Sequence, residues 1–335
     1  MVETLLDIEN LSVEFSNYQG TTSVLDRVSL SIRKGEILGL VGESGCGKTV
    51  TAKAILRLIP EPPGKITSGV IRFEGEDLLK VSRRRMSRVR GNEISMIFQE
   101  PMSSLNPVFT VGNQMREVVR HHRGLDRRQA NALCLDMLRQ VQMPDPMEVL
   151  KKYPHELSGG MRQRVMIAME LACDPRLLIA DEPTTALDVT VQGQVLAILT
   201  ELSRQRGISV LMITHDMGVV AQVCDRVAVM YAGRVVELAP VDELFAHPVH
   251  PYTRGLIASI PVVDEPEEDF PGAADLRILH SIPGTVPTLI DPPPGCRFHP
   301  RCEEAIPVCA VSAPDLCWVS PEHAVACHRR AGGAR

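Results

Sequence analysis

A glycine-rich segment at residues 42–49 constrains the fold more than any other part of the chain. It reads GESGCGKT and matches the pattern G-x-x-x-x-G-K-[ST]. An apolar run at residues 37–41 precedes it and a helical pattern at residues 50–58 follows, which is the context in which this pattern binds nucleotide phosphates. Backbone N–H groups of such a loop can surround phosphate oxygens, and the helix dipole favours an anion at the same place.

The side chains of this loop have separate expected roles. Lys48 is predicted to contact the β- and γ-phosphates, and Thr49 to offer its hydroxyl to Mg²⁺. We predict that the nucleotide contacts come from Gly42, Glu43, Ser44, Gly45, Cys46, Gly47, Lys48, Thr49 and Val50.

Composition limits the classes of function. The chain has 335 residues, 44% hydrophobic and 23% charged, which is ordinary for globular proteins and sufficient for two or three domains. Its net charge of −5 gives no support to a nucleic-acid-binding surface. No apolar run approaches the roughly 18 residues of a membrane span. The N-terminus lacks the features of a signal peptide. We therefore expect a cytoplasmic protein that meets a membrane through a partner.

The first third of the chain is predicted to form an antiparallel sheet that leads into a nucleotide-binding core. Residues 5–15 alternate between apolar and polar and are expected to be an edge strand. Further strands are predicted at residues 24–32, 69–73 and 94–98. Helical spacing then dominates residues 100–172.

The middle of the chain alternates strand and helix, which indicates a parallel α/β sheet. Strands are predicted at residues 177–181 and 209–214, with a helix at residues 190–206 between them and a hairpin at residues 227–238 after them. Prolines become frequent from about residue 245, and we expect a tail with little regular structure there.

Four polar residues at predicted strand ends suit phosphoryl transfer. Gln99 can bridge Mg²⁺ and the attacking water, and Asp181 can hold Mg²⁺ through water. Glu182 is placed to polarise that water, and His215 can reach the γ-phosphate. A lone glutamine or histidine at a strand end is more often structural. All four in this order after the glycine loop indicate a catalytic site.

The segment LSGGM at residues 157–161 is not needed by a typical enzyme with this phosphate loop. A serine and two glycines that open a helix make a second phosphate-binding surface, which we assign to Ser158, Gly159, Gly160 and Met161. Because this surface is far in sequence from Lys48, it favours an arrangement in which two chains hold one nucleotide between them.

Together these motifs resemble the ABC ATPase family over residues 5–240. The matches are Walker A (residues 42–49), the Q-loop glutamine Gln99, the signature (157–161), Walker B (177–181), the base Glu182, the D-loop (186–188) and the switch histidine His215. The resemblance implies a head-to-tail dimer, with ATP between Walker A of one subunit and the signature of the other. It assigns Mg²⁺ to Thr49, Gln99 and Asp181.

The same resemblance implies an α/β fold of the ABC-type P-loop NTPase class. The RecA-like core with its antiparallel β subdomain would take residues 1–99 and 173–240, the helical signature subdomain residues 100–172, and an irregular C-terminal extension residues 241–335. An aromatic side chain is expected to stack on adenine, with Phe15 as first choice and Tyr18 as second.

Three segments look like the peptide and nickel importers of this family. They are QEPMSSLNP at residues 99–107, HPYTRGL at residues 250–256, and a cysteine-rich end that begins GCRFHPRC at residue 295. The resemblance of that end to dipeptide and oligopeptide ATP-binding subunits implies a 4Fe–4S cluster on Cys296, Cys302, Cys309 and Cys327.

The residues alone leave the ligand of these cysteines open. Their spacing, C-x5-C-x6-C-x17-C, lacks the tight pairs that are typical of structural zinc, yet four thiolates suit either zinc or an iron–sulfur cluster. Unligated thiols are a third interpretation. Cys317 departs from the family pattern and could be a neighbour of the site, a spare thiol or an alternative ligand.

We therefore expect the ATPase subunit of an importer for di- or oligopeptides, on the cytoplasmic face of the inner membrane. The implied partners are a second, paralogous ATPase subunit, two transmembrane permease subunits and an extracytoplasmic solute-binding protein, with no nucleic acid. Two alternatives are an importer of nickel or another small solute, and a soluble ABC ATPase without a transport role.

Overall fold

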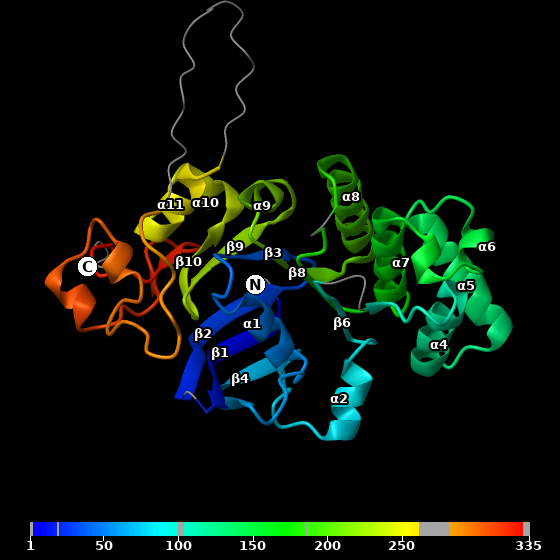
Figure 1. The fold of residues 1–335 in the computed structure, drawn as a ribbon, viewed down its shortest axis with the longest axis horizontal. Coiled ribbons are helices and arrows are strands. Elements are labelled where there is room, and N and C mark those ends of the chain that lie inside the picture. The colour runs from blue at the N-terminus through cyan, green and yellow to red at the C-terminus, as the bar shows by residue number, and fades with distance from the viewer. Residues whose placement is uncertain (1–2, 19, 100–103, 185–186, 261–281, 331–335) are drawn as a thin grey trace, which may run out of the picture.

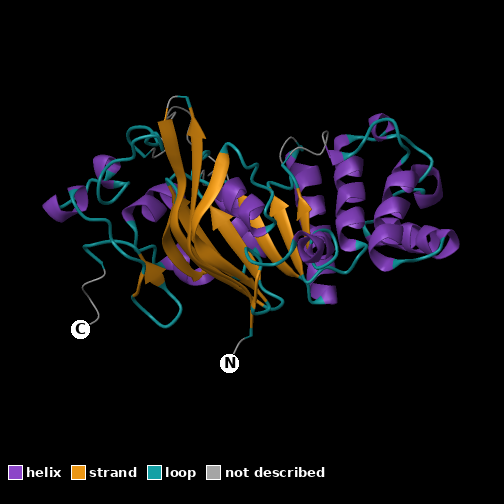
Figure 2. Cartoon of the chain, turned by 90° about the horizontal axis from the view of Figure 1, so that it is seen from below, coloured by secondary structure: helices purple, strands orange, loops and turns teal. Residues whose placement is uncertain are grey.

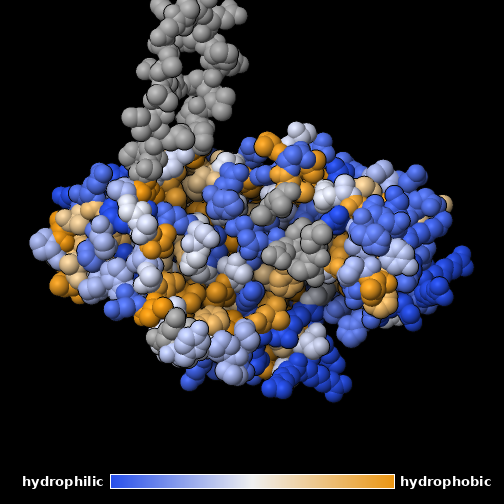
Figure 3. Space-filling model, viewed as in Figure 1, coloured by the Kyte–Doolittle hydropathy of each residue, from blue (hydrophilic) through white to orange (hydrophobic). Residues whose placement is uncertain are grey.

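The computed structural model describes residues 3–18, 20–99, 104–184, 187–260 and 282–330. Two sheets form the centre of the molecule (Figure 1). Figure 2 shows the strands gathered in the middle, with a group of helices at one end and the C-terminal part at the other. Polar side chains cover most of the face in Figure 3, and apolar ones gather where the antiparallel strands lie.

The larger sheet has the order β11-β12-β10-β9-β3-β8-β7-β6. Its parallel part consists of β6 (Ile94–Ile97), β7 (Leu177–Asp181), β8 (Ser209–Thr214), β3 (Ile37–Val41) and β9 (Arg226–Tyr231). Every residue of these strands is buried, which explains why they are continuous apolar runs rather than alternating ones. The predicted bounds of β7 and β8 are confirmed.

Helices α1 (Lys48–Ile55), α8 (Val189–Arg206) and α9 (Met217–Val223) connect or flank these strands. The hairpin predicted near residue 232 is confirmed, because β10 (Arg234–Pro240) pairs antiparallel with β9. The phosphate loop therefore leaves a central strand that has parallel neighbours on both sides.

The smaller, antiparallel sheet corrects one prediction. It has the order β2-β1-β4-β5, formed by β1 (Thr4–Asn17), β2 (Gly20–Arg33), β4 (Gly64–Phe73) and β5 (Glu76–Asp77). β1 pairs with both β2 and β4, so it is an interior strand and not an edge strand. Its polar alternation reflects one exposed face of the sheet, a pattern that does not distinguish edge from interior.

A helical group projects from the far side of β6. The group contains α4 (Val111–Arg123), α5 (Arg127–Gln140), α6 (Pro146–Val149) and α7 (Gly159–Leu171). Helix α2 (Arg83–Val89) precedes β6 and is not part of it. α5 starts at a capping box between Asp126 and Gln129, and its apolar face, including Cys134, is buried. α7 packs on α5, α8 and β6, which attaches the group to the core.

The C-terminal part is more ordered than expected. It contains α10 (Val241–Ala246), α11 (Pro251–Ala258) and two short strands, β11 (Cys317–Trp318) and β12 (Ala324–Val325). β12 pairs with β10, so the tail extends the core sheet. Two-residue strands are too short to give a periodic signal.

Glu237 on β10 joins this extension to the core. Its carboxylate is fully buried and accepts hydrogen bonds from the backbone N–H groups of Val249 (2.7 Å) and His250 (3.0 Å) and from His323 Nε2 (2.7 Å). Burial raises the pKa of Glu237, but these bonds outweigh it and hold the pKa below its ordinary value. One carboxylate thus connects β10, residues 249–250 and His323.

Glu237→Ala is predicted to destabilise the chain strongly, because it leaves buried donors without an acceptor. We expect a loss of about 3–5 kcal/mol in the free energy of unfolding, measured by urea unfolding of the full chain. Glu322→Ala is the control, since Glu322 makes an exposed ion pair with Arg33, and it should cost less than about 1 kcal/mol. Equal effects of the two substitutions would contradict this role of Glu237.

Candidate functional site

The phosphate loop requires glycine at two positions because neighbouring chain segments lie very close. Gly42 has φ 153°, and a Cβ there would lie 2.1 Å from the carbonyl oxygen of Met230. Gly47 has φ 106°, and its Cβ would lie 2.7 Å from Leu25 Cδ2. The loop is therefore packed against the end of β9 and against β2, which fixes its path before any nucleotide arrives.

Lys48 and Thr49, at the start of α1, make hydrogen bonds within the site. Lys48 Nζ donates to the carbonyl oxygens of Gly42 (2.7 Å) and Glu43 (3.1 Å), so its ammonium lies inside the loop. Thr49 Oγ1 donates to Asp181 Oδ1 (3.2 Å), which brings together two of the predicted Mg²⁺ ligands. Burial raises the pKa of Asp181. A cation would relieve this unfavourable placement of a carboxylate.

The predicted catalytic side chains meet next to this pair. Glu182 accepts from Gln99 Nε2 (3.1 Å), and its other oxygen lies 3.1 Å from His215 Nδ1. These residues follow β7, β6 and β8, which are neighbours in the sheet, so the parallel order puts their carboxyl ends side by side. Glu182 also has φ 49°, a left-handed conformation that is uncommon for a residue with a side chain and is found at functional sites.

The signature segment forms the start of α7. Ser158 is the N-cap, and its Oγ accepts from the backbone N–H of Met161 (3.3 Å). A Cβ on Gly159 would meet Leu187 at 3.3 Å, and one on Gly160 would meet Val191 at 2.6 Å. The glycines thus let the exposed end of α7 lie against the D-loop and the start of α8.

Phe15 and Tyr18, the candidates for stacking on adenine, differ in packing. Phe15 on β1 is half-buried and lies against Gly64, whereas Tyr18 is 98% exposed. Neither the packing of Phe15 nor the exposure of Tyr18 tests the prediction that one of them stacks on adenine. Residues 100–103 of the Q-loop segment and Ala186 of the D-loop lie outside the described residues.

The four predicted cysteine ligands converge. Cys296, Cys302, Cys309 and Cys327 line one small cavity, together with His250, His299 and His328. Cys317 lies exposed on β11 and is not part of this lining. Within the described ranges, no group of three or more histidine, cysteine or acidic side chains has the spacing that a single metal ion requires. The thiols share a cavity without being arranged around one ion.

The sequence did not reveal three contacts between the phosphate loop and later parts of the chain. The backbone N–H of Glu43 donates to Tyr252 Oη (2.9 Å), the carboxylate of Glu43 pairs with Arg301, and the N–H of Gly233 donates to the carbonyl of Cys46 (2.9 Å). Tyr252 and Arg301 lie inside the HPYTRGL and GCRFHPRC segments. Nothing in those segments indicates a partner more than 200 residues away.

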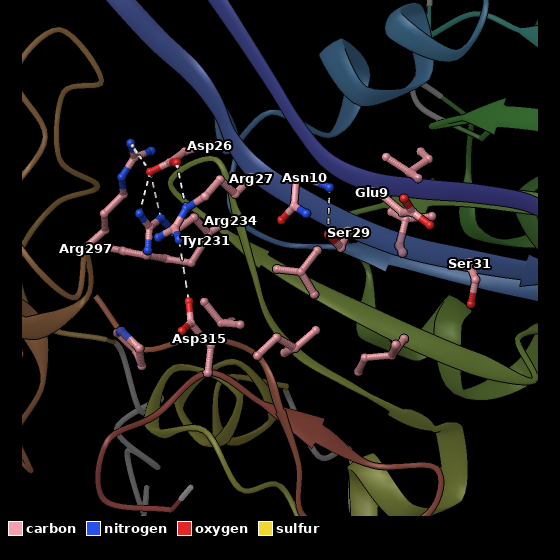
Figure 4. Close-up of a pocket in the computed structure, with 18 of the residues that line it drawn as sticks. Glu9, Asn10, Asp26, Arg27, Ser29, Ser31, Tyr231, Arg234, Arg297 and Asp315 are labelled. Atoms are coloured by element: carbon pink, nitrogen blue, oxygen red, sulfur yellow. Dashed lines mark hydrogen bonds and ion pairs between the residues drawn. The ribbon is translucent and has the colours of Figure 1, made fainter. Parts of the chain in front are cut away.

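A further contact between the extension and the core lies at Asp26. Its carboxylate accepts from Arg234 (2.6 and 2.8 Å) and Arg297 (3.0 Å), at one side of a cavity of ≈ 470 Å³ (Figure 4). The cavity lies between the antiparallel sheet, β10 and the extension, and Figure 4 shows Glu9 and Ser31 further along its wall. Arg297 and Arg301 thus join the extension to β2 and to the phosphate loop.

Two family models match the chain. "ABC transporter" covers residues 25–185, and "Oligopeptide/dipeptide transporter, C-terminal region" covers residues 236–309. The first spans the phosphate loop, the signature and Walker B, and the second includes Cys296, Cys302 and Cys309. In the part of the chain that the structure describes, no helix has the length and apolar character of a membrane span.

Curated relatives match over nearly the full length. The chain is 51% identical over 327 residues to the "Probable peptide ABC transporter ATP-binding protein y4tR" of Sinorhizobium fredii, covering 98% of this chain and 95% of that one. It is 48% identical over 326 residues to the "Dipeptide transport ATP-binding protein DppD" of Bacillus subtilis, covering 97% and 95%.

Solved structures support the same fold. The ATP-binding cassette MJ0796, described as dimeric and bound to ADP and Pi, superposes with a TM-score of 0.63 at 25% identity, covering 70% of this chain and 98% of that one. This confirms the predicted P-loop NTPase fold. The chain belongs to the ABC transporter ATP-binding proteins, in the dipeptide and oligopeptide transporter family.

Proposed function

We propose that this chain hydrolyses ATP to power the import of di- or oligopeptides. The observation that carries the proposal is the meeting of Thr49 with Asp181, and of Gln99 and His215 with Glu182, at the ends of adjacent parallel strands. The peptide class rests on the C-terminal family match and on the names of the relatives.

The proposed mechanism uses the chain's own residues in order. Residues 42–49 bind the phosphates, and Thr49, Asp181 and Gln99 would hold Mg²⁺, which supplies charge neutralisation at the phosphates when bound. Glu182 takes up the proton of the attacking water, and His215 holds Glu182 on one side. Ser158 and the glycines after it offer their N–H groups to the nucleotide of a second subunit.

The chain would act as one subunit of a membrane transporter. Residues 1–99 and 173–240 form the ATPase core, residues 100–172 the signature subdomain and residues 241–335 the extension. A paralogous ATPase subunit completes both nucleotide sites, and two permease subunits convert its closure into alternating access at the cytoplasmic face of the inner membrane. A solute-binding protein on the outer side delivers the peptide.

We also propose that Cys296, Cys302, Cys309 and Cys327 bind a 4Fe–4S cluster. Four cysteine thiolates are the usual ligands of such a cluster, and these four share one cavity. We assign the cluster a structural role, since metal binding can stabilise the segment that supplies the ligands.

The solute is tested by ATPase activity of the complete transporter in liposomes with its binding protein. Short peptides should stimulate hydrolysis, whereas nickel salts should not, because the proposal assigns the chain to peptide import. Stimulation by nickel alone would favour the small-solute alternative. ATPase activity that needs neither permease nor binding protein would favour a soluble ABC ATPase.

Glu182→Gln should abolish turnover while preserving nucleotide binding, because it removes the proton acceptor and leaves the phosphate loop intact. We expect ATPase activity to fall by about 10²–10⁴-fold, the usual contribution of a general base, with ATP binding measured in parallel. Glu201→Gln, on the exposed face of α8, is the matched control and should be unaffected. Turnover at the wild-type rate would remove Glu182 from the mechanism.

Cys302→Ser should lower the iron content of protein purified without oxygen, because the site loses one of four thiolates. Iron and zinc are measured per chain, together with the visible absorption of the cluster. Cys317→Ser is the control and should retain iron, since Cys317 lies outside the cavity. Unchanged iron in the Cys302 variant, or zinc in place of iron, would show that the cluster assignment is wrong.

A further inference from the structure

We propose that Arg301, in the C-terminal extension, is a positioning residue of the ATP site, which acts by neutralising and fixing Glu43 of the phosphate loop. The inference rests on the proposed role of that loop. It adds a residue that lies 258 positions away from the loop and outside every ATPase motif.

The contact is a two-pronged pair of the kind that only arginine can form. Arg301 Nη1 lies 2.8 Å from Glu43 Oε2, and Nη2 lies 3.1 Å from Glu43 Oε1. A planar guanidinium that meets both carboxylate oxygens fixes their orientation as well as their charge. The backbone N–H of Glu43 is held separately by Tyr252 Oη at 2.9 Å. Glu43 is thus anchored at both its side chain and its backbone by residues from beyond the ATPase motifs.

Arg301 is itself held in place. Its side chain is 7% exposed, Nε donates to the carbonyl of Pro283 (2.8 Å), and its guanidinium lies 5.8 Å from the ring centre of Tyr231. A buried arginine with three kinds of partner does not reorient freely. The Arg301–Glu43 ion pair is therefore a fixed connection between the extension and the phosphate loop. It differs in this from an exposed ion pair, which contributes little to stability.

At its loop end, the Arg301–Glu43 pair lies next to Lys48. The carbonyl of Glu43 accepts from Lys48 Nζ (3.1 Å), so movement of Glu43 would displace an acceptor of the lysine that is expected to contact phosphate. The carboxylate of Glu43 also lies within a loop that binds anions. Without Arg301, its unpaired negative charge would repel the nucleotide phosphates.

At its other end, the Arg301–Glu43 pair lies next to the cysteine cavity. Arg301 closes the short 3-10 turn His299–Arg301, and the next residue is Cys302, which lines that cavity. A change at the cysteine site that moves this turn would therefore reach Glu43 through one side chain. The extension is thereby placed to influence nucleotide affinity, while the chemical step at Glu182 uses other residues.

Equilibrium titration of the full chain with ADP tests this inference. Arg301→Gln should raise the Kd for ADP about 10-fold, the size expected for losing one charge-assisted contact. Because the defect is electrostatic, it should shrink at high salt. Adding Glu43→Gln to that variant should restore affinity to within about 3-fold of wild type, since it removes the unpaired carboxylate. A merely structural role predicts neither the salt effect nor the recovery.

Control variants distinguish an error in the role of Arg301 from an error in the proposed nucleotide site. Arg254→Gln removes another arginine–carboxylate pair of the extension, with Glu304, and should leave the Kd unchanged. Arg301→Lys, which keeps the charge, should lie between wild type and Arg301→Gln, and Glu43→Gln alone tests the contact if the Arg301 variants do not fold. The inference is overturned if Arg301→Gln binds ADP normally, or if the double variant binds no better than the single one. If Lys48→Ala retained nucleotide affinity, the proposed site itself would be wrong instead.

Discussion

The close contact between the phosphate loop and the end of β9 is the constraint on which the rest of the structure depends. A side chain at Gly42 or Gly47 would collide with Met230 or Leu25, so the loop can leave β3 along only one path. That path puts Thr49 beside Asp181. Gln99, Glu182 and His215 follow the ends of neighbouring strands, so the order of the parallel sheet brings the side chains that are predicted to be catalytic together.

Charged pairs between distant segments attach the extension to this core. Glu237 binds β10 to His250 and His323, Asp26 receives Arg234 and Arg297, and Glu43 receives Arg301. The extension also packs apolar side chains against the core, among them Leu244, Tyr252 and Phe298. The last of these pairs joins the extension to the phosphate loop.

Sequence patterns predicted the elements whose signal is local. β7 and β8 are apolar runs with polar ends, so their bounds were predicted correctly. The catalytic roles of Gln99, Glu182 and His215 were inferred from motif order and stay a prediction. β1 was wrongly predicted as an edge strand, because alternation reports the two faces of a strand and not its neighbours. β12 and the Arg301–Glu43 pair could not be predicted, since two-residue strands and contacts across 258 positions leave no periodic pattern.

We propose that this chain provides half of each of two nucleotide sites. The Walker A loop belongs to the core, and the signature belongs to the start of α7 beside Leu187 and Val191. The most direct measurement compares Ser158→Arg in the isolated full chain and in the assembled transporter. We expect the nucleotide affinity of the isolated chain to stay within about 2-fold of wild type, and the ATPase activity of the transporter to be lost. Loss of affinity in the isolated chain would contradict it, because the signature would then act on the chain's own loop.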